Sequence, residues 1–371
     1  MKRCIFHIPN NIDLTGKSGS QVRPAKMLKA LKNQGYEVDF VMGYGKARKE
    51  SIKSIKKNIR QGIKYDFLYS ESSTMPTLLT EKNHLPRYPL LDFNFLRFCK
   101  KNGIKVGLFY RDVIWKFEQY KKSVPWYYRV VTFWFYKYDL FQYNKCVDVL
   151  YLPSSRIEQY IPECKKIHKE LLIPGAVLDR KYIDQRKQYF ESRKKGDLNI
   201  FYVGGVSGIY DILEMIKVLQ NIDYVTVTIC CKAEAWEKEK DRYGPYLTNR
   251  IKIVHDSGDA LYQYYKKADL AWCYFDVEQH KYMKIATPIK MLEYMSFLTP
   301  VIATKGSCAA EFIEKYDVGW SIPYNVSEFT KLIEYIYDNQ DSIIKKHNNT
   351  YACLLDNTWE KRIDKIVLDL K

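Results

Sequence analysis

Residues 287–304 (TPIKMLEYMSFLTPVIAT) constrain the fold most, because they predict a helix that leads directly into a buried strand. Thr287 can cap such a helix, and Pro288 suits its first turn, where the missing N–H would have had no partner. Apolar residues at helical spacing follow, and Pro300 begins a short apolar run. This order of elements is typical of an α/β sheet.

The start of this helix is suited to bind an anion. The free N–H groups of a first turn and the positive end of the helix dipole favour negative charge, and Lys290 can add a full positive charge. Glu293, three residues further on, can accept two hydroxyls of a ribose. These residues predict a nucleotide-sugar pocket. The alternative is an ordinary amphipathic helix with a solvated Lys290–Glu293 pair.

A glycine pair follows another predicted strand, residues 198–203. Gly204 and Gly205 allow backbone N–H groups to approach a phosphate, and a helix expected from about residue 210 would complete the anion site.

The 287–304 stretch resembles the donor-site helix of retaining GT-B glycosyltransferases of glycosyltransferase family 4, the group 1 transferases. Members commonly carry Pro-x-Lys-x-x-Glu-Tyr-Met and then a strand like Thr-Pro-Val-Ile-Ala-Thr. Two positions depart from this pattern: Ile285 stands where many members have another Glu, and Leu298 stands where a Gly is usual. The second departure predicts a different local turn. The matching positions are Pro288, Lys290, Glu293, Tyr294, Met295 and residues 300–304.

The resemblance implies an α/β protein of the GT-B fold, in which two Rossmann-like domains face a central cleft. The expected boundaries are residues 1–180 for an N-terminal acceptor-side domain and 197–355 for a nucleotide-sugar-binding domain. The charged residues 181–196 would link the two domains, and residues 356–371 would form a C-terminal helix that crosses back to the N-terminal domain.

Several further site residues follow from the resemblance. The family places the nucleotide base near the position of Lys232. A loop after the first predicted strand faces the donor phosphates or the acceptor, and here it contains Gly16, Ser18 and Gly19. That loop lacks the spacing of a dinucleotide motif or a P-loop, so an ordinary flexible loop is the alternative.

Arg111 and Asp112 directly follow a predicted strand, which is where α/β sheets place ligand contacts. The family often has His-Asp in this loop. Arg111 can hold phosphate or an acidic sugar, and Asp112 can orient or deprotonate an acceptor hydroxyl. A surface Arg–Asp ion pair is the alternative. Together with Lys290, these two residues are the predicted catalytic residues.

The implied activity is transfer of a hexose from a nucleoside-diphosphate sugar, with a UDP-sugar favoured, to a hydroxyl of a glycan or lipid-linked saccharide. Surface polysaccharide synthesis is the expected context. Retention at the anomeric carbon, independence of metal and the absence of a cofactor are further implications. No Asp-x-Asp occurs in the sequence, which agrees with a site that needs no metal.

The charge balance favours an anionic partner, because 60 Lys and Arg stand against 43 Asp and Glu, a net charge of +17. The sequence contains none of the common nucleic-acid-binding motifs, so an anionic membrane surface is favoured over nucleic acid. The N-terminal apolar run is too short for a signal peptide, and no run suits a membrane span. The sequence therefore predicts a cytoplasmic protein, with peripheral attachment to the inner face of a membrane as an option.

Residues 123–143 are crowded with aromatic side chains and read as a helix that is apolar nearly all round. Such a helix is most often buried in a core, which is the prediction. An aromatic belt at a membrane interface, flanked by Lys116, Lys121 and Lys122, is the alternative.

Two other functions fit parts of the pattern. A sugar-nucleotide epimerase or hydrolase of the same fold would share the donor site and lack an acceptor surface. A basic membrane- or nucleic-acid-binding scaffold would have no catalytic function at all.

Overall fold

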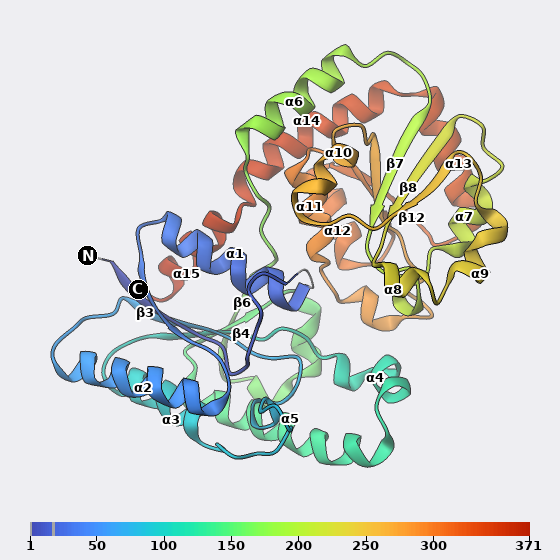
Figure 1. Ribbon diagram of the computed structural model, residues 1–371. Helices are drawn as coiled ribbons and strands as arrows, with labels where there is room; N and C mark the ends of the chain where they lie inside the picture. The colour runs from blue at the N-terminus through green and yellow to red at the C-terminus, as the bar shows by residue number, and fades with distance from the viewer. Residues whose placement is uncertain (1, 17–18) are drawn as a thin grey trace. The chain divides into compact units, whose positions relative to one another are not determined.

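The computed structural model describes residues 2–16 and 19–371, and the chain divides into two compact units. Unit 1 comprises Met1–Pro174 and Trp359–Lys371, and unit 2 comprises Gly175–Thr358. Each unit is built on one six-stranded sheet covered by helices (Figure 1).

The sheet of unit 1 has the strand order β2-β1-β3-β4-β5-β6, and every pairing is parallel. Its strands are β1 Arg3–His7, β2 Glu37–Val41, β3 Phe67–Glu71, β4 Val106–Phe109, β5 Val149–Leu152 and β6 His168–Leu171. Its helices are α1 Gly19–Asn33, α2 Gly45–Arg60, α3 Leu91–Lys101, α4 Glu118–Ser123, α5 Trp126–Cys146 and α15 Trp359–Asp369.

Helices cover both faces of this sheet. Figure 1 shows α1 and α15 on one side and α2, α3 and α5 on the other. The predicted C-terminal helix is confirmed as α15, which packs against α1. Its apolar stripe packs in the core with Phe6 of β1 and Met27 of α1; the stripe consists of Trp359, Ile363, Ile366, Val367 and Leu370.

The sheet of unit 2 has the order β12-β11-β10-β7-β8-β9 and is also parallel throughout. Its strands are β7 Leu198–Val203, β8 Val225–Cys230, β9 Ile251–Val254, β10 Leu270–Cys273, β11 Val301–Thr304 and β12 Gly319–Ile322. Its helices are α6 Arg180–Ser192, α7 Leu213–Leu219, α8 Ala233–Trp236, α9 Lys240–Tyr243, α10 Tyr262–Tyr265, α11 Ile289–Ser296, α12 Cys308–Tyr316, α13 Val326–Asp338 and α14 Asp341–Asp356. The predicted α/β class with parallel sheets is confirmed.

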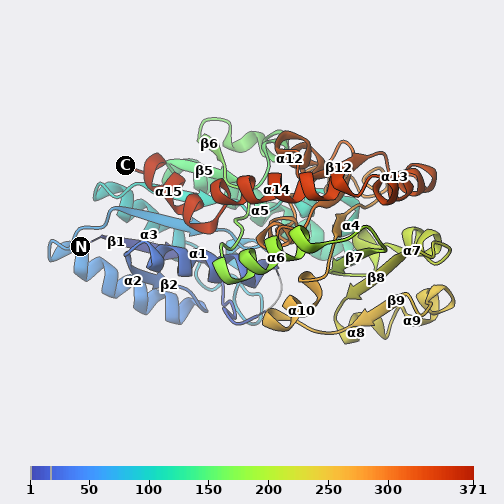
Figure 2. The same ribbon diagram turned by 90° about the horizontal axis from the view of Figure 1, so that it is seen from above.

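Residues 181–196, expected as a linker, instead contribute helix α6. The guanidinium of Arg186 is fully buried and donates to the carbonyl oxygens of Phe297 (2.8 Å), Lys266 (2.9 Å) and Ala268 (2.6 Å). Helix α6 also runs beside α14 (Figure 1, Figure 2). These contacts make the segment a structural part of unit 2, because buried carbonyl groups need such donors.

The aromatic segment at residues 123–143 is helix α5, and the prediction that it is buried is wrong for its first half. Trp126 and Trp134 are 69% and 67% exposed, whereas Leu140 and Tyr143 are buried. The second half of α5 packs on α3, where Tyr138 and Tyr143 lie against the ring of Phe93. Among the described residues, no helix combines the length and apolar character needed to cross a bilayer.

Candidate active site

The predicted donor residues of unit 2 gather at the carboxyl end of its sheet, where β7 ends and α11 begins. Tyr294 of α11 ties the two elements together, because its hydroxyl accepts from the backbone N–H of Val203 at 3.1 Å. Gly204 follows Val203 directly and donates its own N–H to Cys230 at the end of β8, at 2.9 Å. In parallel α/β sheets, ligands bind at the carboxyl ends of the strands.

Lys290 carries its ammonium into a cage of aromatic rings. The Nζ atom lies 4.9 Å from the ring centroid of Tyr202, 4.5 Å from that of Tyr210 and 5.5 Å from that of Phe275. It also lies 3.4 Å from the Tyr202 hydroxyl oxygen. No ion pair joins it to a carboxylate in the described part of the chain. Ring faces attract a cation but do not neutralise it.

Burial lowers the pKa of Lys290 to about 8, and the carboxylate of Glu293 acts in the opposite direction. The charged form of this amine is therefore poorly compensated in the protein alone. An amine perturbed in this way, at the start of α11 and beside the end of β7, makes Lys290 a candidate functional residue.

Gly204 is fixed by this arrangement. A Cβ atom at that position would collide with the Lys290 ammonium and would lie 2.9 Å from the Tyr202 hydroxyl. A Cβ at Gly205 would lie 3.2 Å from the Tyr210 ring. Glycine at these two positions lets the Lys290, Tyr202 and Tyr210 side chains lie close to the backbone, while the approach of a phosphate to the same N–H groups stays a prediction.

Two details of the predicted anion site are wrong. Helix α11 begins at Ile289, so Pro288 rather than Thr287 holds the N-cap position, and Pro288 makes no side-chain capping hydrogen bond. After Gly205 the chain first forms a 3-10 turn at Gly208–Tyr210, and α7 begins only at Leu213. The short helix α7 therefore adds less to the anion site than the sequence predicted.

The other two predicted donor residues, Glu293 and Lys232, also follow or lie on elements at the carboxyl end of this sheet. Glu293 is half-buried on α11, one turn after Lys290. Lys232 follows β8, is exposed and directly precedes α8.

Leu298 lies in the turn between α11 and β11, where a different local turn was expected. Its φ of 51° is in the left-handed region that glycine favours, and its side chain is fully buried. His347 of α14 donates from Nδ1 to the Leu298 carbonyl at 3.0 Å. The turn thus keeps a glycine-like backbone, and burial of the leucine offsets the strain.

The predicted acceptor-side residues lie in unit 1, at the carboxyl end of its own sheet. Arg111 follows β4 and donates to Oε2 of Glu71 at 3.1 Å and to the Ser72 carbonyl at 3.3 Å. Arg111 therefore pairs with Glu71 on the neighbouring strand, and the alternative of an Arg111–Asp112 pair is wrong.

Glu71 is fully buried between two guanidinium groups. Its Oε1 lies 3.3 Å from Nε of Arg23 and accepts from the Tyr69 hydroxyl at 3.0 Å. Arg23 itself is 2% exposed and stacks 3.5 Å over the Phe109 ring. This network holds the loop that carries Arg111 and Asp112.

Asp112 is partly buried and accepts from the Thr74 hydroxyl at 3.0 Å and the Ile114 N–H at 3.2 Å. Burial raises the pKa of its carboxyl group, which moves it toward the range useful for a general base.

Of the glycine loop after β1, the structure describes only part. Gly16 donates its N–H to the Asp13 carbonyl at 3.1 Å, and Gly19 begins α1. Ser18 lies outside the described residues.

The aromatic cage around Lys290 was missed by sequence reasoning. Tyr210 and Phe275 come from separate loops, and no motif links them.

The described residues also contain no group of three or more His, Cys, Asp or Glu placed to hold a metal ion.

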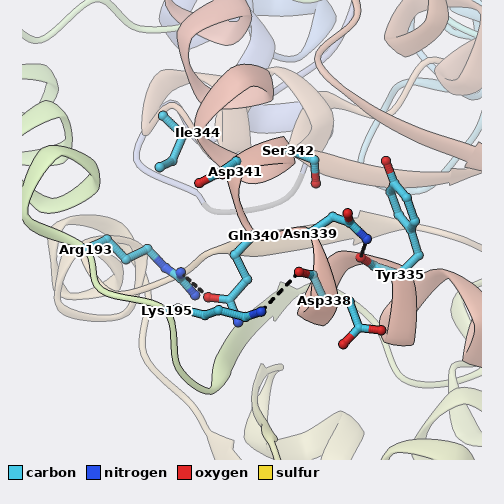
Figure 3. A pocket seen from close by; sticks show the side chains of 9 residues that line it. All are labelled: Arg193, Lys195, Tyr335, Asp338, Asn339, Gln340, Asp341, Ser342 and Ile344. Atoms are coloured by element: carbon cyan, nitrogen blue, oxygen red, sulfur yellow. Dashed lines mark hydrogen bonds between the residues drawn. The ribbon is translucent and has the colours of Figure 1, made fainter.

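A polar pocket of about 380 Å³ lies elsewhere in unit 2 (Figure 3). It is lined by Arg193, Lys195, Tyr335 and Gln340, among others. Lys195 precedes β7, whereas Gly204 follows it. This pocket therefore lies at the amino end of β7, and the donor residues lie at its carboxyl end.

Comparisons with known proteins agree with this geometry. Residues 197–339 match the family model described as Glycosyl transferases group 1. This segment contains β7, Gly204, Lys232, Lys290 and Glu293. No curated protein sequence is significantly similar to the chain.

Solved structures are similar over the whole chain. Sucrose-phosphate synthase from Thermosynechococcus elongatus has a TM-score of 0.67 at 14% identity, with 98% of this chain and 97% of that chain covered. Anabaena HepE in complex with UDP and glucose has a TM-score of 0.61 at 13% identity, with coverages of 100% and 99%. WaaG, a glycosyltransferase involved in lipopolysaccharide biosynthesis, has a TM-score of 0.59 at 15% identity, with coverages of 99% and 99%.

Proposed function

Because this chain belongs to the group 1 glycosyl transferases, matched through residues 197–339, and has the GT-B fold, we propose that it transfers a sugar from a nucleoside-diphosphate sugar to an acceptor hydroxyl. The acceptor in this proposal is a glycan or a lipid-linked saccharide of a surface polysaccharide. The donor is a UDP-sugar, and the configuration of the anomeric carbon is retained without a metal ion.

The observation that carries the proposal is the ammonium of Lys290. It has no carboxylate partner among the described residues, and it lies beside the Gly204 backbone at the carboxyl end of β7. A partly buried cation in this state gains most from an anionic ligand. A diphosphate supplies that charge.

The same group fits the chemistry of sugar transfer. When the bond to the sugar breaks, the departing diphosphate gains negative charge and the sugar becomes oxocarbenium-like. Lys290 and the N–H groups near Gly204 and Gly205 would stabilise that charge, and such preorganised electrostatics are usually the largest catalytic effect. Glu293 would hold the ribose hydroxyls, and Lys232 would lie near the base.

Residues of unit 1 would act on the acceptor. Asp112 would accept the proton of the attacking hydroxyl, and its raised pKa brings it closer to that task. Arg111, held in place by Glu71, would bind an acidic or phosphorylated acceptor through its guanidinium. The Gly16, Ser18 and Gly19 loop stays the predicted phosphate- or acceptor-facing segment.

Two similar structures support the choice of donor and acceptor. HepE was solved with UDP-glucose, and WaaG acts in lipopolysaccharide biosynthesis.

A thermal-shift screen against UDP-, GDP-, ADP- and dTDP-sugars tests the donor. A ligand at 100 times its Kd adds roughly 2.7 kcal/mol of stability, which is easily measured. We expect a UDP-sugar to give the largest shift and Lys290→Ala and Glu293→Ala to abolish it. Absence of any shift, or an unchanged shift in both variants, would refute the donor site.

Transfer and hydrolysis assays test the reaction. Asp112→Asn should keep the donor-induced shift and lose about 10²–10⁴-fold in transfer rate, the usual contribution of a general base. A protein that hydrolyses or epimerises the donor and never transfers sugar to a saccharide would be the epimerase or hydrolase instead.

A further inference from the structure

The first half of α5 exposes a continuous set of large apolar side chains, here called the aromatic face. Its members are between 51% and 69% exposed: Trp126, Tyr127, Tyr128, Val130, Val131 and Trp134. A shallow groove of about 360 Å³ runs through it, lined by Trp126, Arg129, Val130, Phe133 and Trp134. An exposed apolar patch of this kind marks an interaction surface.

The composition of the aromatic face fits a lipid interface. Tryptophan and tyrosine combine an apolar ring with one polar group, so they prefer the boundary between headgroups and acyl chains. The helix lies on the surface of unit 1 with its second half buried, which suits a segment that lies in the interface plane rather than crossing the bilayer.

Positive charge borders the aromatic face. Lys121 and Lys122 are exposed at the end of α4, immediately before α5. The one nearby acidic residue on α4, Glu118, is exposed and pairs with Lys121. Within the groove, Nε of Arg129 is buried and has no hydrogen-bond partner among the described residues. The Arg129 side chain as a whole is half-buried, so its guanidinium can be reached from the surface, and a lipid phosphate would supply a charged acceptor to it.

A second basic surface lies on the same side of the unit 1 sheet. Helix α3 contacts both α2 and α5, and Figure 1 shows all three on one face. The exposed basic side chains of α2 are Lys46, Lys49, Lys53, Lys57 and Arg60, whereas Glu50 is its one acidic residue. Charges near an anionic bilayer attract it even without direct contact.

A second copy of the chain fits this surface less well. A two-fold interface brings the same patch of each copy together, so Lys121, Lys122 and Arg129 would face their own counterparts. Like charges across an interface cost free energy, and lysine is depleted in protein interfaces. An anionic bilayer complements both the rings and the charges.

We propose that the aromatic face of α5 docks unit 1 onto an anionic phospholipid bilayer, with Trp126 and Trp134 in the interface and Arg129 bound to a lipid phosphate. Lys121 and Lys122 contact the headgroups, and the basic face of α2 adds longer-range attraction. The proposal goes beyond the transferase reaction and does not depend on it. It would bring the enzyme to a lipid-linked acceptor.

Vesicle sedimentation of the full chain tests the docking. The probes are phosphatidylcholine vesicles with and without phosphatidylglycerol. We expect binding to the anionic vesicles, weakened by salt, together with a blue shift of tryptophan fluorescence. Lys121→Glu with Lys122→Glu should weaken partitioning by at least about tenfold, since each basic residue near the surface contributes on the order of 1 kcal/mol.

Trp126→Ser with Trp134→Ser should abolish both the sedimentation and the blue shift, and Arg129→Gln should weaken binding to anionic vesicles alone. The matched controls are Lys266→Glu with Lys267→Glu, an exposed lysine pair in unit 2, and Tyr335→Ser with Leu368→Ser, whose side chains are 52% and 77% exposed. These controls should bind vesicles as the unaltered chain does.

The UDP-sugar thermal shift should be the same in all these variants, which also shows that they fold. Equal vesicle binding by the unaltered chain and the α5 variants would overturn the proposal. A doubled solution mass that the tryptophan double variant returns to one copy, without vesicle binding, would assign the face to a second copy and would equally overturn it.

Discussion

The ammonium of Lys290 lies 4.5 Å from the ring centroid of Tyr210, in a turn that follows the Gly204–Gly205 backbone. The cation is thus held by ring faces and by close backbone approach, and no acid of the described chain neutralises it. The charged Lys290 side chain should therefore destabilise the ligand-free protein and strengthen the binding of an anionic ligand. Stability and donor binding are linked through this one side chain.

Lys290→Met should therefore stabilise the protein and abolish donor binding. Methionine has a similar volume and carries no charge, so the penalty of a poorly compensated cation disappears. We expect unfolding at pH 7 to require about 1–3 kcal/mol more free energy, measured by urea denaturation without ligand. A destabilised variant that still binds a UDP-sugar would contradict the role given to the ammonium.

The pH dependence of donor binding should follow the same amine. Burial lowers the pKa of Lys290 from 10.5 to about 8, so the free protein loses this charge as pH rises through about 8. Donor affinity should then fall with rising pH in that range. The free energy of unfolding of the ligand-free protein should instead rise with pH between about 8 and 10.5, because the unfolded chain binds more protons than the folded chain in this range. Titration calorimetry of the unaltered chain at several pH values measures the donor affinity. Urea unfolding of the unaltered chain and of Lys290→Met, both without ligand, measures the change in stability.

Gly204→Ala should weaken donor binding without unfolding the protein. The new Cβ would displace the flexible end of Lys290 and press on the Tyr202 hydroxyl, while backbone packing need not change. We expect roughly tenfold weaker binding, or about 1.4 kcal/mol. Gly244→Ala is the matched control, because its Cβ would meet nothing within 4 Å. Equal donor affinity in the two variants would show that the ammonium position is unimportant.

Local patterns predicted much of this molecule. Residues 198–203 were expected as a strand with the bounds that β7 has, and the helix expected within residues 356–371 is present as α15. These elements depend on alternation, helical spacing and turn residues within short windows. The group 1 resemblance came from a different source, the motif in residues 287–304.

Contacts between distant residues were less predictable. The ring of Phe275 reaches Lys290 from another loop, and no spacing rule connects them. Hydropathy also showed that α5 is apolar but not whether a neighbour covers each side, so the exposure of Trp126 was missed. The pairing of Arg111 with Glu71 could be predicted more easily, because Glu71 ends β3 and Arg111 lies two residues after the end of the neighbouring parallel strand β4.

Glu71→Gln should destabilise unit 1 far more than Arg111→Gln. The first change leaves the buried Arg23 guanidinium and Arg111 without their shared carboxylate, which costs about 3 kcal/mol or more. The second change leaves Glu71 paired with Arg23, and we expect a loss of about 1 kcal/mol. Urea unfolding of both single variants and of the double variant measures the coupling. The reverse order of the two losses would contradict the central position of Glu71.

Acid should destabilise unit 2 through His347. This ring is buried, stacks 3.9 Å from Phe190 and donates to the Leu298 carbonyl. Burial lowers its pKa from 6.5 to about 4, and the nearby positive charges of Arg186 and Lys187 act in the same direction. Between pH 4 and pH 6.5, His347 is therefore protonated in the unfolded chain and neutral in the folded chain.

The stabilising contribution of neutral His347 is complete above pH 6.5 and is lost as pH falls from 6.5 to 4. Its full size is up to about 3 kcal/mol. His347→Gln keeps an amide donor for the Leu298 carbonyl and removes the titration, so it should lower stability at pH 7 and flatten the pH dependence. Urea midpoints of both proteins at several pH values in this range measure the difference. A variant that loses stability as steeply as the unaltered chain would assign the acid sensitivity to other groups.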